Sequence, residues 1–103
     1  MASDDKQAAQ LTLRHASLAC PVGVYEHYKG GQYIVFAHTV DEATLQALVH
    51  YFCCARGTRW TRTVANFMEP VDGTPRFRHV RTASLGEWRM ATGEQLYTEA
   101  GDG

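Results

Sequence analysis

The sequence of 103 residues is poor in cysteine and proline, with three of each. An odd number of cysteines, two of them adjacent at Cys53 and Cys54, does not fit the disulfide framework of a small secreted domain, so we expect reduced thiols. No run approaches the ~18 apolar residues that a membrane-spanning helix needs, and the N-terminus is polar and acidic, unlike a signal peptide. These absences predict a cytoplasmic protein.

The sequence also lacks the motifs of common enzyme and cofactor sites, namely the nucleophile elbow, the phosphate-binding loop, the dinucleotide fingerprint and the HExxH zinc motif. Its carboxylates are scattered over predicted turns. His38, His50 and Cys53 are residue types that bind metals, but His50 and Cys53 fall on opposite faces of one predicted strand. We therefore predict no acid–base centre made of paired carboxylates, no metal site and no cofactor.

The net charge of −1 conceals an uneven distribution. Between positions 50 and 90 the chain carries seven arginines and only three acidic residues, a local balance of +4, whereas the segments before and after it are acidic. Arginine is suited to bidentate contacts with carboxylate or phosphate groups. The basic segment therefore favours an anionic partner.

Short strand-like segments separated by turn residues make up the centre of the chain. Val22–Tyr28 and Gln32–His38 flank Lys29-Gly30-Gly31, which predicts a hairpin because glycine tolerates positive φ. Three more strands are expected at Leu48–Cys54, Arg59–Val64 and Arg76–Arg81. Five short strands at this spacing predict a mainly β fold, either a small barrel or a strongly bent sheet.

Short turns are expected between these strands. Asp41 can start a helical turn after the second strand, residues 65–68 form another before Pro70, and residues 72–75 form a tight turn. One segment has two interpretations, since residues 45–52 also fit a helix.

The ends of the chain differ from its centre. Residues 1–20 are predicted to be a tail or a short helix through Asp4–Ala9, with Leu11 and Leu18 packing back on the domain. The β domain itself spans residues 21–82.

Residues 83–103 change character again. Ser84-Leu85-Gly86-Glu87 fits a capping box at the start of a helix. A short amphipathic helix is then expected, with Trp88, Met90, Leu96 and Tyr97 on its apolar side. Residues 101–103 are expected to be disordered.

A series of landmarks runs through Gly23–Val80: YEHYKGG from position 25, Ala37-His38, Trp60-x-Arg62, Phe67-x-Glu69 and Pro75-Arg76-Phe77. In this order they resemble a bacterial family called domain of unknown function 1653. The resemblance implies an SH3-like barrel and no established activity. The chain departs from the family pattern at Thr63, where members usually have proline, and at Asn66, where they usually have methionine.

Aromatic and cationic side chains on different predicted strands form the candidate ligand site: Tyr25, His27, Lys29, Trp60, Arg62 and Arg76, with Phe77 as a further aromatic. Stacking surfaces among cations are typical of sites for single-stranded nucleic acid or nucleotides. We therefore interpret the chain as a non-enzymatic binding module for an anionic ligand, with nucleic acid or nucleotide as the first hypothesis.

Other interpretations stay open. His27 with Lys29 beside Tyr25 could act as an acid–base pair in a small hydrolase-like enzyme. A groove of the barrel could instead bind a peptide, as SH3 domains do. In a purely structural interpretation Trp60 belongs to the core and Arg62 forms an ion pair with Glu42 or Glu69. Convergence of the candidate residues in one cleft would favour ligand binding.

Overall fold

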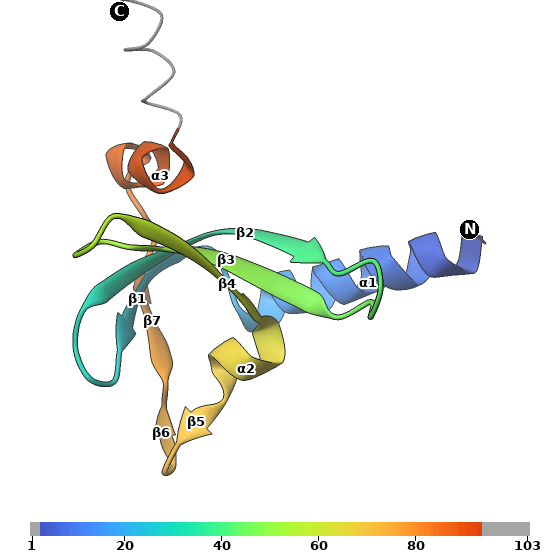
Figure 1. Cartoon of the computed structure of the whole chain (residues 1–103), viewed down its shortest axis with the longest axis horizontal. Coiled ribbons are helices and arrows are strands. Elements are labelled where there is room, and N and C mark those ends of the chain that lie inside the picture. The colour runs from blue at the N-terminus through green and yellow to red at the C-terminus, as the bar shows by residue number, and fades with distance from the viewer. Residues whose placement is uncertain (1–2, 94–103) are drawn as a thin grey trace, which may run out of the picture.

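The computed structural model describes residues 3–93 (Figure 1). A five-stranded antiparallel sheet has the order β4-β3-β2-β1-β7, and a separate hairpin pairs β5 with β6. The strands are β1 (Gly23–His27), β2 (Gln32–Val40), β3 (Ala47–Cys53), β4 (Thr58–Thr63), β5 (Pro70–Val71), β6 (Thr74–Pro75) and β7 (Phe77–Arg81). The helices are α1 (Ser3–Ala19), α2 (Val64–Met68) and α3 (Leu85–Thr92). None of these helices is long and apolar enough to cross a membrane.

The prediction of a mainly β fold is confirmed, but the sheet does not close into a barrel. Strands β4 and β7 lie at its two edges, and no pairing joins them within residues 3–93. The chain between them, α2 followed by the β5–β6 hairpin, passes below one face of the sheet (Figure 1). Phe67 of α2 fills the space on that face and stacks on Phe77 of β7, with ring centroids 4.0 Å apart. Packing of this connection therefore replaces closure of the sheet.

The predicted hairpin between the first two strands is confirmed. Gly30 and Gly31 have φ values of 101° and 92°, which a residue with a Cβ adopts only at a cost. The Gly30 N–H donates to the carbonyl of His27 at 2.8 Å, and the His27 N–H donates to the carbonyl of Gly31 at 3.1 Å. The glycines thus reverse the chain where the sequence predicted.

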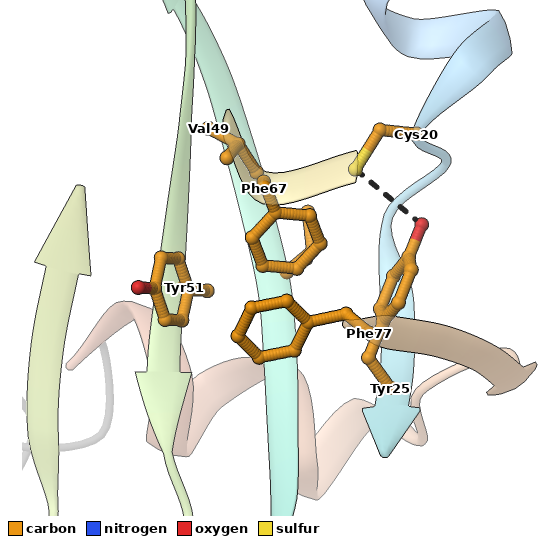
Figure 2. Packing of buried hydrophobic residues seen from close by; sticks show 7 residues of the cluster. Cys20, Tyr25, Val49, Tyr51, Phe67 and Phe77 are labelled. Atoms are coloured by element: carbon orange, nitrogen blue, oxygen red, sulfur yellow. Dashed lines mark hydrogen bonds between the residues drawn. The ribbon is translucent and has the colours of Figure 1, made fainter. Parts of the chain in front are cut away.

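The two faces of the sheet carry separate core clusters. The first consists of Cys20, Tyr25, Val35, Val49, Tyr51, Phe67 and Phe77, and the second of Val24, Ile34, Phe52 and Ala91. Figure 2 shows the first cluster, in which the rings of Phe67 and Phe77 lie between Tyr51 and Tyr25. Helix α3 covers the second cluster, on the opposite side of the sheet from α2 (Figure 1). Alternation along β1 sends Tyr25 to one cluster and Val24 to the other.

A β-bulge changes the side-chain alternation along β2. The register with β3 shifts between Val35 and Ala37, so Phe36 is an extra residue. Val35 therefore faces the first cluster, as does His38, whose Nε2 lies 2.6 Å from the carbonyl oxygen of Cys20. Without the bulge these two residues would point to opposite faces.

The N-terminal segment is a helix, much longer than the short one considered from the sequence. Helix α1 has 17 residues, and its C-terminal half lies against β2 and β3. The prediction that Leu11 and Leu18 pack on the domain is wrong, because their exposed fractions are 52% and 75%. Ala16 and Cys20 are buried instead. Two leucines seven residues apart share one helical face, but which face meets the sheet depends on how the helix docks.

The predicted turns are largely confirmed. Thr63 caps α2 by accepting a hydrogen bond from the backbone N–H of Asn66. The turn between β5 and β6 places Asp72 and Gly73 at φ values of 51° and 80°, as a two-residue hairpin requires. After β2 the chain forms a turn and not a helix, with the Asp41 carboxylate accepting the N–H of Ala43. The helical interpretation of residues 45–52 is wrong, since β3 pairs with a strand on each side.

The capping box of α3 is present as predicted. The Ser84 hydroxyl accepts the backbone N–H of Glu87, and the Glu87 carboxylate accepts the backbone N–H of Ser84. The helix ends at Thr92, with Gly93 in the left-handed conformation. The predicted apolar positions 96 and 97, and the predicted disorder at 101–103, lie outside the described residues.

Candidate ligand-binding cleft

A cleft with a volume of about 310 Å³ lies on the face of the sheet that carries the first core cluster. All five strands of the main sheet contribute to it, together with the turn between β3 and β4. Its lining residues are His27, Tyr33, Tyr51, Cys53, Arg56, Trp60, Thr61, Arg62 and Phe77. None of these is a carboxylate, so the described lining combines aromatic rings with cations.

Strand register explains why these side chains meet. Tyr33 pairs with Cys53 across β2 and β3, and Tyr51 pairs with Trp60 across β3 and β4. Residues two apart on a strand share a face, which adds Arg62 to the same side as Trp60. The antiparallel pairing therefore lines up aromatic and cationic residues that are far apart in the sequence.

Aromatic rings form the floor of the cleft. The ring of Phe77 lies 5.3 Å from that of Tyr33 and 5.6 Å from that of Tyr51, both nearly perpendicular. Trp60 lies outside this packed group, with 54% of its surface exposed. Its indole N–H donates to the Thr58 hydroxyl at 2.8 Å. The interpretation of Trp60 as a core residue is therefore wrong, and this partly exposed residue lines the cleft.

Arg62 is held in place by neutral partners. Its Nε donates to the Tyr51 hydroxyl at 2.8 Å, and its Nη1 donates to the Asn66 side chain at 2.6 Å. No carboxylate of residues 5–93 forms an ion pair with Arg62, whereas Glu69 pairs with Arg76 at 3.7 Å. The predicted ion pair from Arg62 to Glu42 or Glu69 is thus absent from the described part. A fixed but uncompensated guanidinium attracts an anion, because little reorganisation is needed on binding.

His27 stands at one end of the cleft. Its Nδ1 accepts the backbone N–H of Lys29 at 3.1 Å, so the neutral ring carries its proton on Nε2. Partial burial, with the positive charges of Arg76, Arg62 and Lys29 in that order, lowers the pKa of His27 below its usual value. Three cations therefore influence the protonation of His27, although only Arg62 among them lines the cleft.

The cysteines follow the prediction. All three are free, with Cys20 and Cys53 buried. Cys53 lines the cleft, where burial and the neighbouring thiol raise the pKa of Tyr33. Cys54 packs against the second core cluster on the opposite face. The adjacent thiols thus cannot serve one site, as strand alternation predicts.

Only half of the six predicted site residues line the cleft: His27, Trp60 and Arg62. Tyr25 is in the core, 1% exposed, and its hydroxyl donates to the Pro21 carbonyl at 2.7 Å and to the Cys20 sulfur at 3.5 Å (Figure 2). Lys29 is at the hairpin, with its Nζ 5.7 Å from the ring centroid of Tyr28. Arg76 is tied to Glu69. Of these three, Lys29 and Arg76 do not line the cleft, but their charges help to lower the pKa of His27, which does.

Sequence reasoning missed five residues of the cleft, namely Tyr33, Tyr51, Cys53, Arg56 and Thr61. The alternation within 48–54 was the available signal, because it places Tyr51 and Cys53 on one strand face. Nothing in the sequence indicates that Tyr33 lies opposite Cys53, since that pairing depends on the bulge in β2.

Metal-ligand types are dispersed over residues 3–93, where no group of three histidine, cysteine or acidic side chains comes together. His50 lies on the other face from Cys53, between the hydroxyls of Thr39 and Thr61 at 2.7 Å and 3.1 Å.

Comparison with models of protein families identifies the family of this chain. The model of the family described as protein of unknown function, DUF1653, matches residues 23–79. The chain belongs to this family. The match contains β1 to β6 and most of β7, hence every residue that lines the cleft, whereas α1 and α3 lie outside it.

A crystal structure of a DUF1653 protein from Bordetella bronchiseptica is similar to this chain. The two share 31% sequence identity with a TM-score of 0.54, and the similarity covers 61% of this chain and 90% of the other. The comparison with curated proteins gives no match. For this DUF1653 protein the comparisons thus establish the family and the fold, and its activity has to be argued from the cleft.

Proposed function

We propose that the cleft of this DUF1653 protein binds a nucleotide, either free or as a unit of a single strand. The observation that carries the proposal is the half-exposed ring of Trp60 beside Arg62, a guanidinium with no carboxylate partner in the described part. The base stacks on Trp60, and the phosphate lies between Arg62 and Arg56. Stacking on aromatic side chains next to arginine is the usual way of binding single-stranded nucleic acid without reading its sequence.

The size of the cleft supports a small ligand. Its volume of about 310 Å³ is near the lower end of the ~300–1,000 Å³ typical of ligand pockets. A single nucleotide suits this space better than a folded partner does. The Tyr51 hydroxyl and the Asn66 side chain hold Arg62 before a ligand arrives, so less side-chain entropy is lost on binding.

One observation favours a second candidate, the binding of an extended acidic peptide. Strand β4 is an edge strand that pairs only with β3 among the described strands, and it presents Trp60 and Arg62 to the cleft. A peptide could add to this edge as a further strand. The hydrolase-like alternative centred on His27 stays a hypothesis, as does a cytoplasmic location.

Fluorescence titration of Trp60 tests the nucleotide proposal, using a Trp88→Phe variant so that Trp60 is the single tryptophan. A nucleoside 5′-monophosphate should quench the signal, and the matching nucleoside without phosphate should bind at least tenfold more weakly, because Arg56 and Arg62 lose their partner. An acidic peptide of similar charge serves as the competitor that distinguishes the second candidate.

Variants then distinguish the contribution of base stacking from that of charge. The measured quantity is the affinity for a short labelled single strand at several salt concentrations. Trp60→Ala should weaken binding by about 1–3 kcal/mol with little change in salt dependence. Arg62→Ala should flatten the slope of log affinity against log salt by roughly 0.7. Arg89→Ala, which changes an exposed arginine of α3 outside the cleft, is the matched control. If the folded protein binds neither nucleotide nor strand at low salt, the proposal is wrong.

A further inference from the structure

A second cleft with a volume of about 240 Å³ adjoins the first. Its lining residues are Glu26, His27, Tyr28, Thr74, Pro75 and Arg78. His27 lines both clefts, so its ring is a wall that the two share. We propose that the two clefts bind successive nucleotides of one single strand, with the first base at Trp60, the second at Tyr28 and the connecting phosphate at His27. This inference rests on the proposed function of the first cleft.

A continuous row of rings joins the two clefts. Tyr33 in the first cleft lies 6.1 Å from His27, and His27 lies 4.7 Å from Tyr28 in the second, both measured between ring centroids. Tyr28 is an exposed aromatic, with 40% of its surface accessible. Consecutive bases of a strand need aromatic surfaces at neighbouring positions, and this row provides them.

Positive charge gathers at the junction of the clefts. Lys29 follows Tyr28 in the hairpin and places its Nζ over that ring. Arg62 approaches from the first cleft, and Arg76 precedes Phe77, which pairs with His27 across β7 and β1. Partial burial and these three charges lower the pKa of His27. A phosphodiester at the junction would therefore lie between Arg62, which lines the first cleft, and Lys29, which lies beside Tyr28 of the second, whereas Arg76 is paired with Glu69.

The second cleft has a different chemistry from the first. Glu26 and Arg78 form an ion pair at 2.6 Å, so their charges cancel, and Tyr28 and Pro75 provide apolar surface. A neutral site of this kind suits a base better than a phosphate. The Glu26 carboxylate can accept a hydrogen bond from a base amino group, and the Arg78 guanidinium can donate to a ring nitrogen or carbonyl.

A ladder of short oligonucleotides tests the inference. The affinities of a 5′-phosphorylated mononucleotide, dinucleotide and trinucleotide are measured by calorimetry at one salt concentration. We expect the dinucleotide to bind about tenfold or more tightly than the mononucleotide, since a second stacking surface is engaged. The step from dinucleotide to trinucleotide should be much smaller, because the inference provides aromatic surfaces for two bases, at Trp60 and Tyr28.

Variants at Tyr28 decide between the second cleft and a simple effect of charge. Tyr28→Ala should bring the affinity ratio of dinucleotide to mononucleotide close to one, and Tyr28→Phe should retain it, because phenylalanine keeps the ring. If the mononucleotide binds at Trp60 but the dinucleotide gains nothing, or gains equally in Tyr28→Ala, the two-cleft inference is overturned and the proposed function stands. If no member of the ladder binds, both are overturned.

Discussion

The guanidinium of Arg59 holds the C-terminal end of α3, with its Nε donating to the carbonyl of Ala91 at 2.7 Å. Its Nη2 donates to the carbonyl of Met90 at 3.2 Å. The last carbonyls of a helix lack partners within the helix and carry a partial negative charge, so a cation there is stabilising. Arg59 and Arg62 point to opposite faces of β4, one to the helix and the other to the cleft.

Arg59→Ala should therefore weaken the docking of α3, whereas Arg62→Ala should spare it. For Arg59→Ala we expect a loss of about 1–2 kcal/mol in the free energy of unfolding, from charge-assisted hydrogen bonds that are partly exposed. Urea denaturation followed by Trp88 fluorescence measures this loss. Arg89→Ala is the control, and an equal loss in that variant would show that Arg59 has no special role.

The hairpin glycines should tolerate no β-branched side chain. Gly31→Val should lower the free energy of unfolding by about 1–3 kcal/mol, because valine has to adopt the positive φ of this position. Gly86→Ala in α3 should have the opposite effect on stability. An added Cβ there meets no atom within 4 Å, and alanine is favoured over glycine in a helix. It should stabilise the protein by up to about 1 kcal/mol. Thermal melting of both variants checks the two signs.

The stability of the part of the domain around α3 should decrease at low pH. The Arg81 guanidinium, with the capping hydrogen bonds of Ser84, lowers the pKa of Glu87 from 4.5 to about 2. A carboxyl with a lowered pKa contributes stability that is fully present above its unfolded value and is lost as pH falls through the folded value. Unfolding should thus become easier between about pH 4.5 and pH 2.

Glu87→Gln is the test of this acid dependence. The variant should be less stable than the parent above pH 4.5 and should lack most of the loss between pH 4.5 and pH 2. Chemical denaturation at several pH values provides the comparison. The same acid profile in both proteins would mean that another carboxyl is responsible.

The thiols should react with alkylating reagents in a fixed order. Cys20 is fully buried, and burial raises the pKa of its thiol, so both access and thiolate are restricted. Cys54 is partly exposed, although burial raises the pKa of its thiol as well. Iodoacetamide labelling of the reduced protein, followed by peptide mass spectrometry, should show Cys54 modified first and Cys20 last. Early modification of Cys20 would contradict its place in the core.

The pKa of His27 should report the charges around the cleft. Arg76→Gln should raise this pKa toward 6.5, because a nearby positive charge that opposes protonation is removed. Arg89→Gln is the control, since Arg89 is an exposed arginine of α3 outside the cleft and is not among the charges that lower the pKa of His27. An NMR titration of the histidine ring measures both. In the parent protein the neutral ring is favoured, so the contribution of His27 to stability is present above pH 6.5 and is lost as pH falls below it.

The sequence by itself determined the local elements of this protein, because their causes are local. Paired glycines at 30 and 31 require a reversal, the spacing of Ser84 and Glu87 forms a capping box, and alternation separates Cys53 from Cys54. The landmarks from 23 to 80 likewise predicted the family that the comparison confirms. The same reasoning selected Trp60 and Arg62, which line the cleft.

Only the tertiary structure decided which candidates share a site and which belong to the core. Tyr25 and Trp60 are both aromatic residues on predicted strands, yet one is 1% exposed and the other 54%. The difference arises because β1 is an inner strand, paired with β2 and β7, and Phe67 of α2 packs on Tyr25, whereas β4 is an edge strand. Sequence periodicity describes one strand at a time. It carries no information on strand order, on the bulge in β2 or on the connection that keeps the sheet open, and these depend on contacts between residues far apart in the chain.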